Sequence, residues 1–177
     1  IESGWGDCYM CAGVESMSRV KRRGFNWSPN PKLSIDWPQA YVEMGETAEN
    51  VAQKWNITRE QQEQFAYESH IKSSKAVSDG NFSDELIEIN SDSASVSDDG
   101  CIRFEPSIEA MSGLRPVFSD SGTVTAATSS PLTDGATALI VCSEEFASSH
   151  GLQPLVRIVS GTATGCKPEL MGMGPVS

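Results

Sequence analysis

Residues 122–135 read GTVTAATSSPLTDG, and the rest of the sequence can be arranged around this stretch. It is rich in threonine and serine, has glycine at both ends, and carries no charge before Asp134. The apolar run ATALIVCS follows at 136–143, and its length and composition predict a strand buried on both faces. Because open α/β sheets bind ligands in loops at strand ends, the hydroxyl-rich loop is a candidate ligand site. A surface turn is the alternative interpretation.

The composition limits the class of protein. The chain has 177 residues, enough for one domain or slightly more with a real hydrophobic core. It is 38% hydrophobic and 21% charged, and no apolar run approaches the roughly 18 residues of a membrane span. The formal net charge is −11, which opposes nucleic-acid binding because phosphate contacts need clustered Lys and Arg. The one basic cluster, RVKRR at 19–23, is expected to be a solvated turn.

The N-terminus and the cysteines predict processing and compartment. The chain begins with Ile, with neither a basic nor an apolar leader region, so we expect a fragment or processed product without a secretory signal. The odd number of five scattered cysteines predicts free thiols and a cytoplasmic location. Cys8 and Cys11 form a CxxC, but on a strand they would face opposite sides of the sheet. We therefore expect no metal site there.

The first half of the chain predicts a strand followed by a helix pair. The strand is expected at 7–12, and the proline-containing stretch 24–38 reads as an ordered loop or insertion. Apolar residues at helical spacing predict a helix over 45–56. A T-x-x-Q capping box begins a second helix that spans 58–80, with Phe65 on its buried face.

The second half predicts shorter elements and a return to the sheet. An edge strand is expected at 83–89 and a short helix, capped by Ser107, up to residue 114. After the apolar strand, a helix over 143–151 and a strand over 154–164 are expected. The predicted order is a strand, a long excursion, and then a strand, a helix and a strand. This order is typical of a parallel α/β core with one large insertion.

The sequence lacks the motifs of several common enzyme classes. Ser130, Asp134 and His150 suggest a hydrolase triad, but GxSxG is absent. HExxH, GxGxxG and the P-loop pattern are also absent, so zinc-peptidase, dinucleotide and P-loop interpretations have no motif behind them.

Six blocks follow one another along nearly the whole chain: AGVESMS at 12–18, MGETAENVA at 44–52, ITREQQEQFAYESH at 57–70, LRPVF at 114–118, GTVTAATSSPLTDGA at 122–136 and MGMGP at 171–175. In this order the sequence resembles the middle portion of the thiolases, the acetyl-CoA acyltransferases. The resemblance implies an α/β thiolase-like core of αβαβα layers, incomplete here, with a large inserted loop domain. It assigns residues 1–18 and 132–153 to the end of the N-terminal core domain, 19–131 to the CoA-binding loop domain, and 154–177 to the start of the C-terminal core domain.

The resemblance also implies contacts to coenzyme A as a substrate. Arg103 matches an arginine near the nucleotide end of CoA, where a guanidinium can face phosphate or stack on adenine. Ser130 matches a serine whose hydroxyl meets the pantetheine amide. Met44 matches a methionine beside the acyl pocket. Apolar positions that line the pantetheine tunnel are matched by Phe118, Leu132 and Met171. Ordinary packing is the alternative role for each of these six residues.

The family's catalytic groups are not expected in this segment. Thiolases use a cysteine upstream of the AGVESMS block and two histidines and a second cysteine downstream of the matched blocks. None of the five cysteines here, and neither His70 nor His150, matches them. Glu43 stands where short-chain acetoacetyl thiolases often have histidine, and TSSP at 128–131 resembles thiolases of fatty-acid degradation.

The resemblance predicts thiolytic cleavage of 3-oxoacyl-CoA, or the reverse Claisen condensation, for the full-length protein. The segment alone is expected to bind CoA without catalysing that reaction. A homodimer or tetramer, and membership of a β-oxidation complex, are implied as assemblies. The alternative function is a non-catalytic thiolase-like protein that binds acyl-CoA or lipid.

Overall fold

The computed structural model describes residues 1–20, 22–92 and 94–177, so Lys21 of the basic cluster and Ser93 lie outside the description. The chain divides into two compact units, each discontinuous in sequence. Unit 1 comprises Ile1–Pro29 and Leu132–Thr164, and unit 2 comprises Asn30–Pro131 and Gly165–Ser177. The assignment of these segments to core and loop domains stays a prediction.

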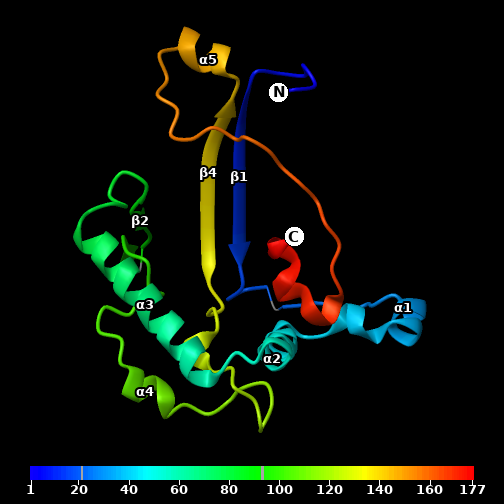
Figure 1. Ribbon diagram of the computed structural model, residues 1–177. Helices are drawn as coiled ribbons and strands as arrows, with labels where there is room; N and C mark the ends of the chain where they lie inside the picture. The colour runs from blue at the N-terminus through cyan, green and yellow to red at the C-terminus, as the bar shows by residue number, and fades with distance from the viewer. Residues whose placement is uncertain (21, 93) are drawn as a thin grey trace. The chain divides into compact units, whose positions relative to one another are not determined.

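Unit 1 is built on a two-stranded antiparallel ribbon. Strand β1 (Cys8–Ser16) pairs with β4 (Asp134–Cys142) over its whole length, and Figure 1 shows the two arrows side by side with opposite directions. The strands predicted around 7–12 and 136–143 are confirmed, but parallel pairing is wrong for them. The reason is that β4 begins at Asp134 directly opposite the last residue of β1, Ser16. The excursion therefore leaves and re-enters the ribbon at the same end, as a hairpin loop does.

Burial in unit 1 differs from the prediction. Leu139 and Ile140 of β4 are more than half exposed, although this strand was expected to be buried on both faces. No strand forms over 154–164, where Leu155 is 98% exposed. A strand needs a neighbour for its backbone donors and acceptors, and within the described residues the sheet contains only β1 and β4.

The predicted helix after β4 is confirmed as α5 (Glu144–Ser149). The Ser143 hydroxyl caps it by accepting from Phe146 N at 3.1 Å. Gly151 follows its end with φ at +64°, a backbone conformation that glycine adopts without steric cost.

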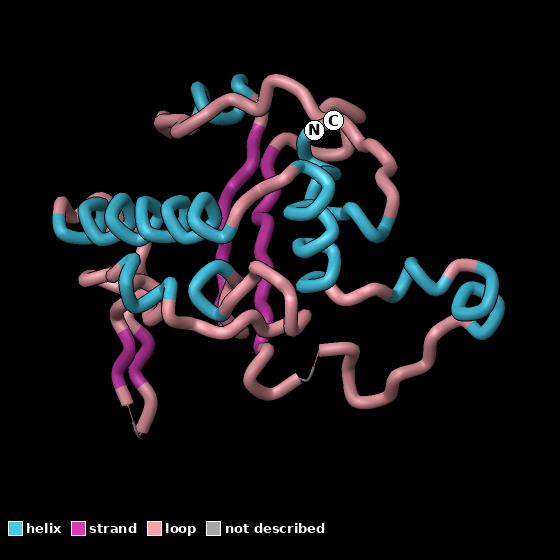
Figure 2. Tube along the Cα trace, turned by 60° about the horizontal axis from the view of Figure 1, so that its bottom comes forward, coloured by secondary structure: helices cyan, strands magenta, loops and turns pink. Residues whose placement is uncertain are grey.

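Unit 2 is built of helices with one short hairpin, visible as the small pair of strands in Figure 2. The stretch 24–38 contains a helix that begins after Asn30, whose side chain accepts from Leu33 N. The edge strand predicted at 83–89 is wrong, because turns occupy the segment through residue 85 and only Ile89–Asn90 pairs. In chain order the elements are α1 (Pro31–Asp36), the 3₁₀ helix η1 (Pro38–Tyr41), α2 (Met44–Trp55), α3 (Arg59–Ser78), β2 (Ile89–Asn90), β3 (Ser95–Val96), α4 (Ile108–Ser112), and the 3₁₀ helices η2 (Ala126–Thr128) and η3 (Pro168–Val176).

Helix α3 has the predicted start but a different inner face. The capping box is confirmed, since Thr58 N donates to Gln61 Oε1 at 2.9 Å and Gln61 N donates to Thr58 Oγ1 at 3.3 Å. Phe65, predicted to be buried, is 77% exposed, whereas Glu63 is buried. Arg59 forms an ion pair with Glu63 and also donates to two carbonyl oxygens at the end of α4. The two hydrogen bonds from Arg59 attach the start of α3 to the end of α4. None of the described helices is long and apolar enough to cross a bilayer.

Candidate functional site

Helix α2 gathers several of the predicted CoA-contacting residues. Met44 is its first residue, and Gly45 follows. A methyl group placed on Gly45 would lie 2.1 Å from Phe118 Cδ1, so the Phe118 ring rests against the helix backbone next to Met44. Only glycine permits this approach. The structure thus brings Met44 and Phe118 together, and their side chains stay 56% and 39% exposed.

Met171 reaches the same helix through η3. Asn50 Nδ2 donates to Glu169 O at 3.1 Å, and a methyl group on Gly172 would lie 3.7 Å from Val51 Cγ2. The segment around Met171 therefore lies along α2, as Figure 1 shows for the red C-terminal helix. This contact is six to seven residues, about 10 Å, along the helix from Met44.

Glu49 of α2 anchors the start of the hydroxyl-rich loop. Its carboxylate accepts from Thr123 N at 2.9 Å, Val124 N at 2.8 Å and Thr123 Oγ1 at 3.1 Å. A methyl group on Gly122 would lie 2.3 Å from Glu49 Oε1 and 3.0 Å from Ser119 O, so only glycine leaves room for the carboxylate. Charge-assisted hydrogen bonds of this kind are stronger than neutral ones. Sequence reasoning missed Glu49, because no local motif links it to a loop more than 70 residues away.

The hydroxyl groups of the loop divide into structural and exposed ones. Thr125 is completely buried, and its Oγ1 has no hydrogen-bond partner among the described residues. Thr128 Oγ1 accepts from Thr125 N at 2.9 Å, and Ser129 Oγ donates to Thr125 O at 2.8 Å. These bonds stabilise the turn at η2. Ser130 is the first exposed hydroxyl after Thr125, as the predicted contact to pantetheine requires.

The backbone of Arg103 is fixed by two residues of α3. Arg103 N donates to His70 Nδ1 at 3.2 Å, and Ser74 Oγ donates to Arg103 O at 3.2 Å. Because Nδ1 of His70 accepts, its ring is in the tautomer with the proton on Nε2. His70 and Ser74 are one helical turn apart, so together they hold one peptide segment against the helix. The Arg103 residue itself is exposed.

Helix α3 contacts both the hydroxyl-rich loop and the backbone of Arg103. Gln62 Nε2 donates to Thr123 Oγ1 at 2.9 Å, at the start of the hydroxyl-rich loop. Ser74, which holds Arg103, is 12 residues further along α3, about 18 Å along its axis. The loop and Arg103 are therefore attached to one rigid helix at well-separated points. Such a spacing suits an elongated ligand rather than a compact one.

Leu132 and Asp134 belong to unit 1. Leu132 is 70% exposed, and the other five predicted contacts all belong to unit 2. Asp134 accepts from Ser18 N at 2.9 Å and from the hydroxyls of Ser18 and Ser16. The Ser18 hydrogen bonds, from hydroxyl and then backbone, lower the pKa of Asp134.

The triad suggested by the sequence finds no support. Asp134 is committed to Ser16 and Ser18 rather than to a histidine. The His150 ring stacks on Phe146, and its Nδ1 lies 3.0 Å from Phe146 O. No group of three potential metal ligands occurs within the described residues.

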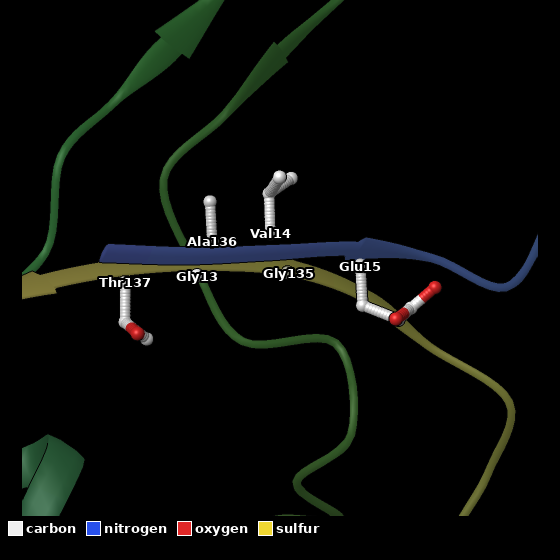
Figure 3. Close-up of a pocket in the computed structure, with 6 residues that line it drawn as sticks. All are labelled: Gly13, Val14, Glu15, Gly135, Ala136 and Thr137. Atoms are coloured by element: carbon white, nitrogen blue, oxygen red, sulfur yellow. The ribbon is translucent and has the colours of Figure 1, made fainter. Parts of the chain in front are cut away.

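A pocket lies at the glycine-containing end of the unit 1 ribbon (Figure 3). Val14 and Ala136 point to one side of the ribbon, and Glu15 and Thr137 point to the other. The hollow exists because Gly13 and Gly135 contribute no side chains. None of the predicted CoA contacts lines it, so it does not support a ligand site.

Comparison with known proteins assigns the chain to a family. A family model described as "Thiolase, N-terminal domain" matches residues 1–145. The 3-ketoacyl-CoA thiolase of Idiomarina loihiensis is 43% identical, and the match covers 99% of this chain and 47% of that protein. The chain spans about half the length of the curated relatives it matches.

Solved structures agree with this match. The dimeric peroxisomal thiolase of Saccharomyces cerevisiae superposes with a TM-score of 0.89 at 31% identity, covering 98% of this chain and 46% of that one. Human mitochondrial 3-ketoacyl-CoA thiolase in complex with CoA gives a TM-score of 0.79 at 35% identity, covering 96% and 46%. The predicted α/β thiolase-like fold class, with an incomplete core, is confirmed. The chain belongs to the thiolase family.

Proposed function

We propose that the full-length protein is a thiolase that acts on 3-oxoacyl-CoA, and that the residues described above bind its CoA moiety. The relatives named 3-ketoacyl-CoA thiolase and the CoA complex of the human structure support this proposal. The reaction is cleavage of 3-oxoacyl-CoA to acetyl-CoA and a shortened acyl-CoA, or the reverse condensation. The dimeric yeast structure supports a homo-oligomeric assembly.

The roles proposed for the residues follow from their chemistry. The Arg103 guanidinium binds a phosphate or stacks on the adenine of CoA, while His70 and Ser74 fix the backbone that carries it. The Ser130 hydroxyl bonds the pantetheine amide. Exposed apolar side chains flank the pantetheine arm and the acyl group; these are Phe118, Leu132 and Met171 for the arm and Met44 for the acyl group.

The chemical step is proposed to use groups other than those of this segment. In thiolases a cysteine thiolate attacks the keto carbon of 3-oxoacyl-CoA, and the bond from this carbon to the α-carbon breaks to release acetyl-CoA. The acyl-enzyme that remains then passes its acyl group to the thiol of free CoA. Oxyanion holes stabilise the enolate and the tetrahedral intermediates. We assign no catalytic residue among these 177. The segment binds and orients the substrate.

The single observation that carries the proposal is the attachment of Arg103 and the hydroxyl-rich loop to the same helix, about 18 Å apart. The test is calorimetric titration of the chain with CoA. Arg103→Gln should weaken binding about fivefold, because an exposed charge-assisted contact contributes about 1 kcal/mol. Ser130→Ala should weaken it about threefold.

The matched control is Lys32→Gln, which removes an equal charge from exposed helix α1. It should leave the CoA affinity unchanged, and the salt dependence of binding should fall for Arg103→Gln alone. Equal CoA affinities for the wild type and Arg103→Gln would contradict the assignment of Arg103. A chain that binds acyl-CoA while the full-length protein shows no thiolysis would favour the non-catalytic alternative.

A further inference from the structure

The register of the unit 1 ribbon sets two cysteines directly opposite each other. Cys8 of β1 pairs with Cys142 of β4. Just beyond them, Ser143 N donates to Asp7 O at 2.8 Å, so residues 7 and 143 form a hydrogen-bonded pair. Because the two pair types alternate in an antiparallel ladder, Cys8 and Cys142 form a non-hydrogen-bonded pair.

This pair type places side chains close together on one face. Opposed Cα atoms in non-hydrogen-bonded pairs are about 4.5 Å apart, within the range of about 4.4–6.8 Å that disulfides span. Both cysteines are free thiols here. We propose that Cys8 and Cys142 are a reversible oxidation site, which closes to a cross-strand disulfide and reopens on reduction.

The other thiols are poor competitors for this bond. Cys11 is on the opposite face of β1, opposite Leu139, and about 10 Å along the strand from Cys8. Burial raises the pKa of the Cys101 thiol, as do the hydrogen bond that this thiol donates to the Asp99 carboxylate and the negative charge of Asp99, so its thiolate fraction is lowered. Cys101 and Cys166 both belong to unit 2 and are outside the ribbon.

The exposure of the two thiols determines which cysteine reacts with the oxidant first. Cys8 is exposed and Cys142 is half-buried, so a small disulfide reaches Cys8 first. The Cys8 thiolate attacks one sulfur of R–S–S–R, which forms a mixed disulfide and releases RS⁻. The Cys142 thiolate then attacks the Cys8 sulfur and releases the second RS⁻. The protein loses two protons and two electrons, and the oxidant is reduced to two thiols.

Charge selects the class of oxidant. Asp7 adjoins Cys8 in sequence, and the chain carries a net charge of −11. Glu144, two residues after Cys142, is paired with Arg157 at 2.9 Å and adds little to this negative charge. Anionic disulfides are therefore repelled, whereas a small neutral disulfide is not. Once formed, the disulfide would link β1 to β4 at one end of the ribbon. The hydrogen bond from Ser18 to Asp134 lies at the other end.

The test uses hydroxyethyl disulfide, a neutral reagent, on the full 177-residue chain, followed by alkylation and peptide mapping without reduction. The expected product is an intramolecular Cys8–Cys142 peptide that dominates all other links, with a mass lower by two hydrogens and reversed by dithiothreitol. Cys11→Ser, the matched variant on the same strand, should give the same product. Cys8→Ser should give no intramolecular link to Cys142.

Two results would overturn the proposal. One is a stable mixed disulfide on Cys8 that never passes to Cys142. The other is a link from Cys11 or Cys166 to Cys8 that is as abundant as the Cys8–Cys142 link. Both are read from the wild-type map, so the outcome does not depend on the folding of any variant or on CoA binding.

Discussion

Replacement of Glu49 tests whether α2 holds the hydroxyl-rich loop. Its carboxylate accepts two backbone N–H bonds and one hydroxyl bond from Thr123 and Val124. Glutamine keeps one acceptor oxygen but places an NH₂ group against a backbone donor. The loss of one charge-assisted bond, with one donor left unsatisfied, should lower the free energy of unfolding by about 2 kcal/mol.

The assay is urea denaturation of Glu49→Gln beside Glu85→Gln, an exposed turn residue with the same change of charge. The first variant should lose about 2 kcal/mol with an unchanged m-value, and its melting temperature should fall by about 4–8 °C. The control should shift by less than about 0.5 kcal/mol.

Gly122→Ala provides a second route to the same contact. Its methyl group would displace the Glu49 carboxylate, so it should destabilise the protein in the wild-type background more than in Glu49→Gln. Both Glu49→Gln and Gly122→Ala should also weaken CoA binding, because the loop carries Ser130. An unfolding midpoint of Glu49→Gln equal to that of the wild type would refute the reasoning.

Three further outcomes are expected. Thr125→Val should stabilise the protein by about 1 kcal/mol in urea denaturation, since it replaces a buried hydroxyl that lacks a partner among the described residues; a loss of stability would show that this hydroxyl is bonded. Hydrogen bonds from Ser18 lower the pKa of Asp134, so its charged form stabilises the fold above the ordinary value of 3.8, and this contribution is lost as the pH falls through the lowered pKa. Asp134→Asn should therefore lose less unfolding free energy than the wild type between about pH 6 and pH 3. Equal losses in the two proteins would contradict this role of the Asp134 carboxylate. The purified chain should release no acetyl-CoA from acetoacetyl-CoA in the presence of CoA, as a spectrophotometric assay would show.

Local signals in the sequence predicted local structure well. The capping box at Thr58, the cap at Ser143 and the stop at Gly151 each depend on residues within one or two turns, and all three are confirmed. Both strands of the ribbon were placed for the same reason, because their apolar runs are continuous.

Features that depend on distant partners could not be predicted. The direction of strand pairing depends on where the excursion returns, and no residue within β1 or β4 encodes that. The hydrophobicity of Phe65 predicts that it lies on the inner face of α3, but the buried face carries Glu63, beside Arg59, which donates to Met111 O and Leu114 O. Glu49 could not be found because its partners are 74 residues away. The Glu49 carboxylate can accept from Thr123 N only because Gly122, beside it, has no side chain.

The pairing of β1 with β4 has a consequence for synthesis of the chain. At least 118 residues separate the paired positions, so β1 leaves the ribosome long before its partner exists. During that interval its apolar side chains, among them Met10 and Val14, have no strand beside them and offer an unpaired edge to other chains. Within this segment, β1 is therefore most exposed to such pairing before β4 has been synthesised.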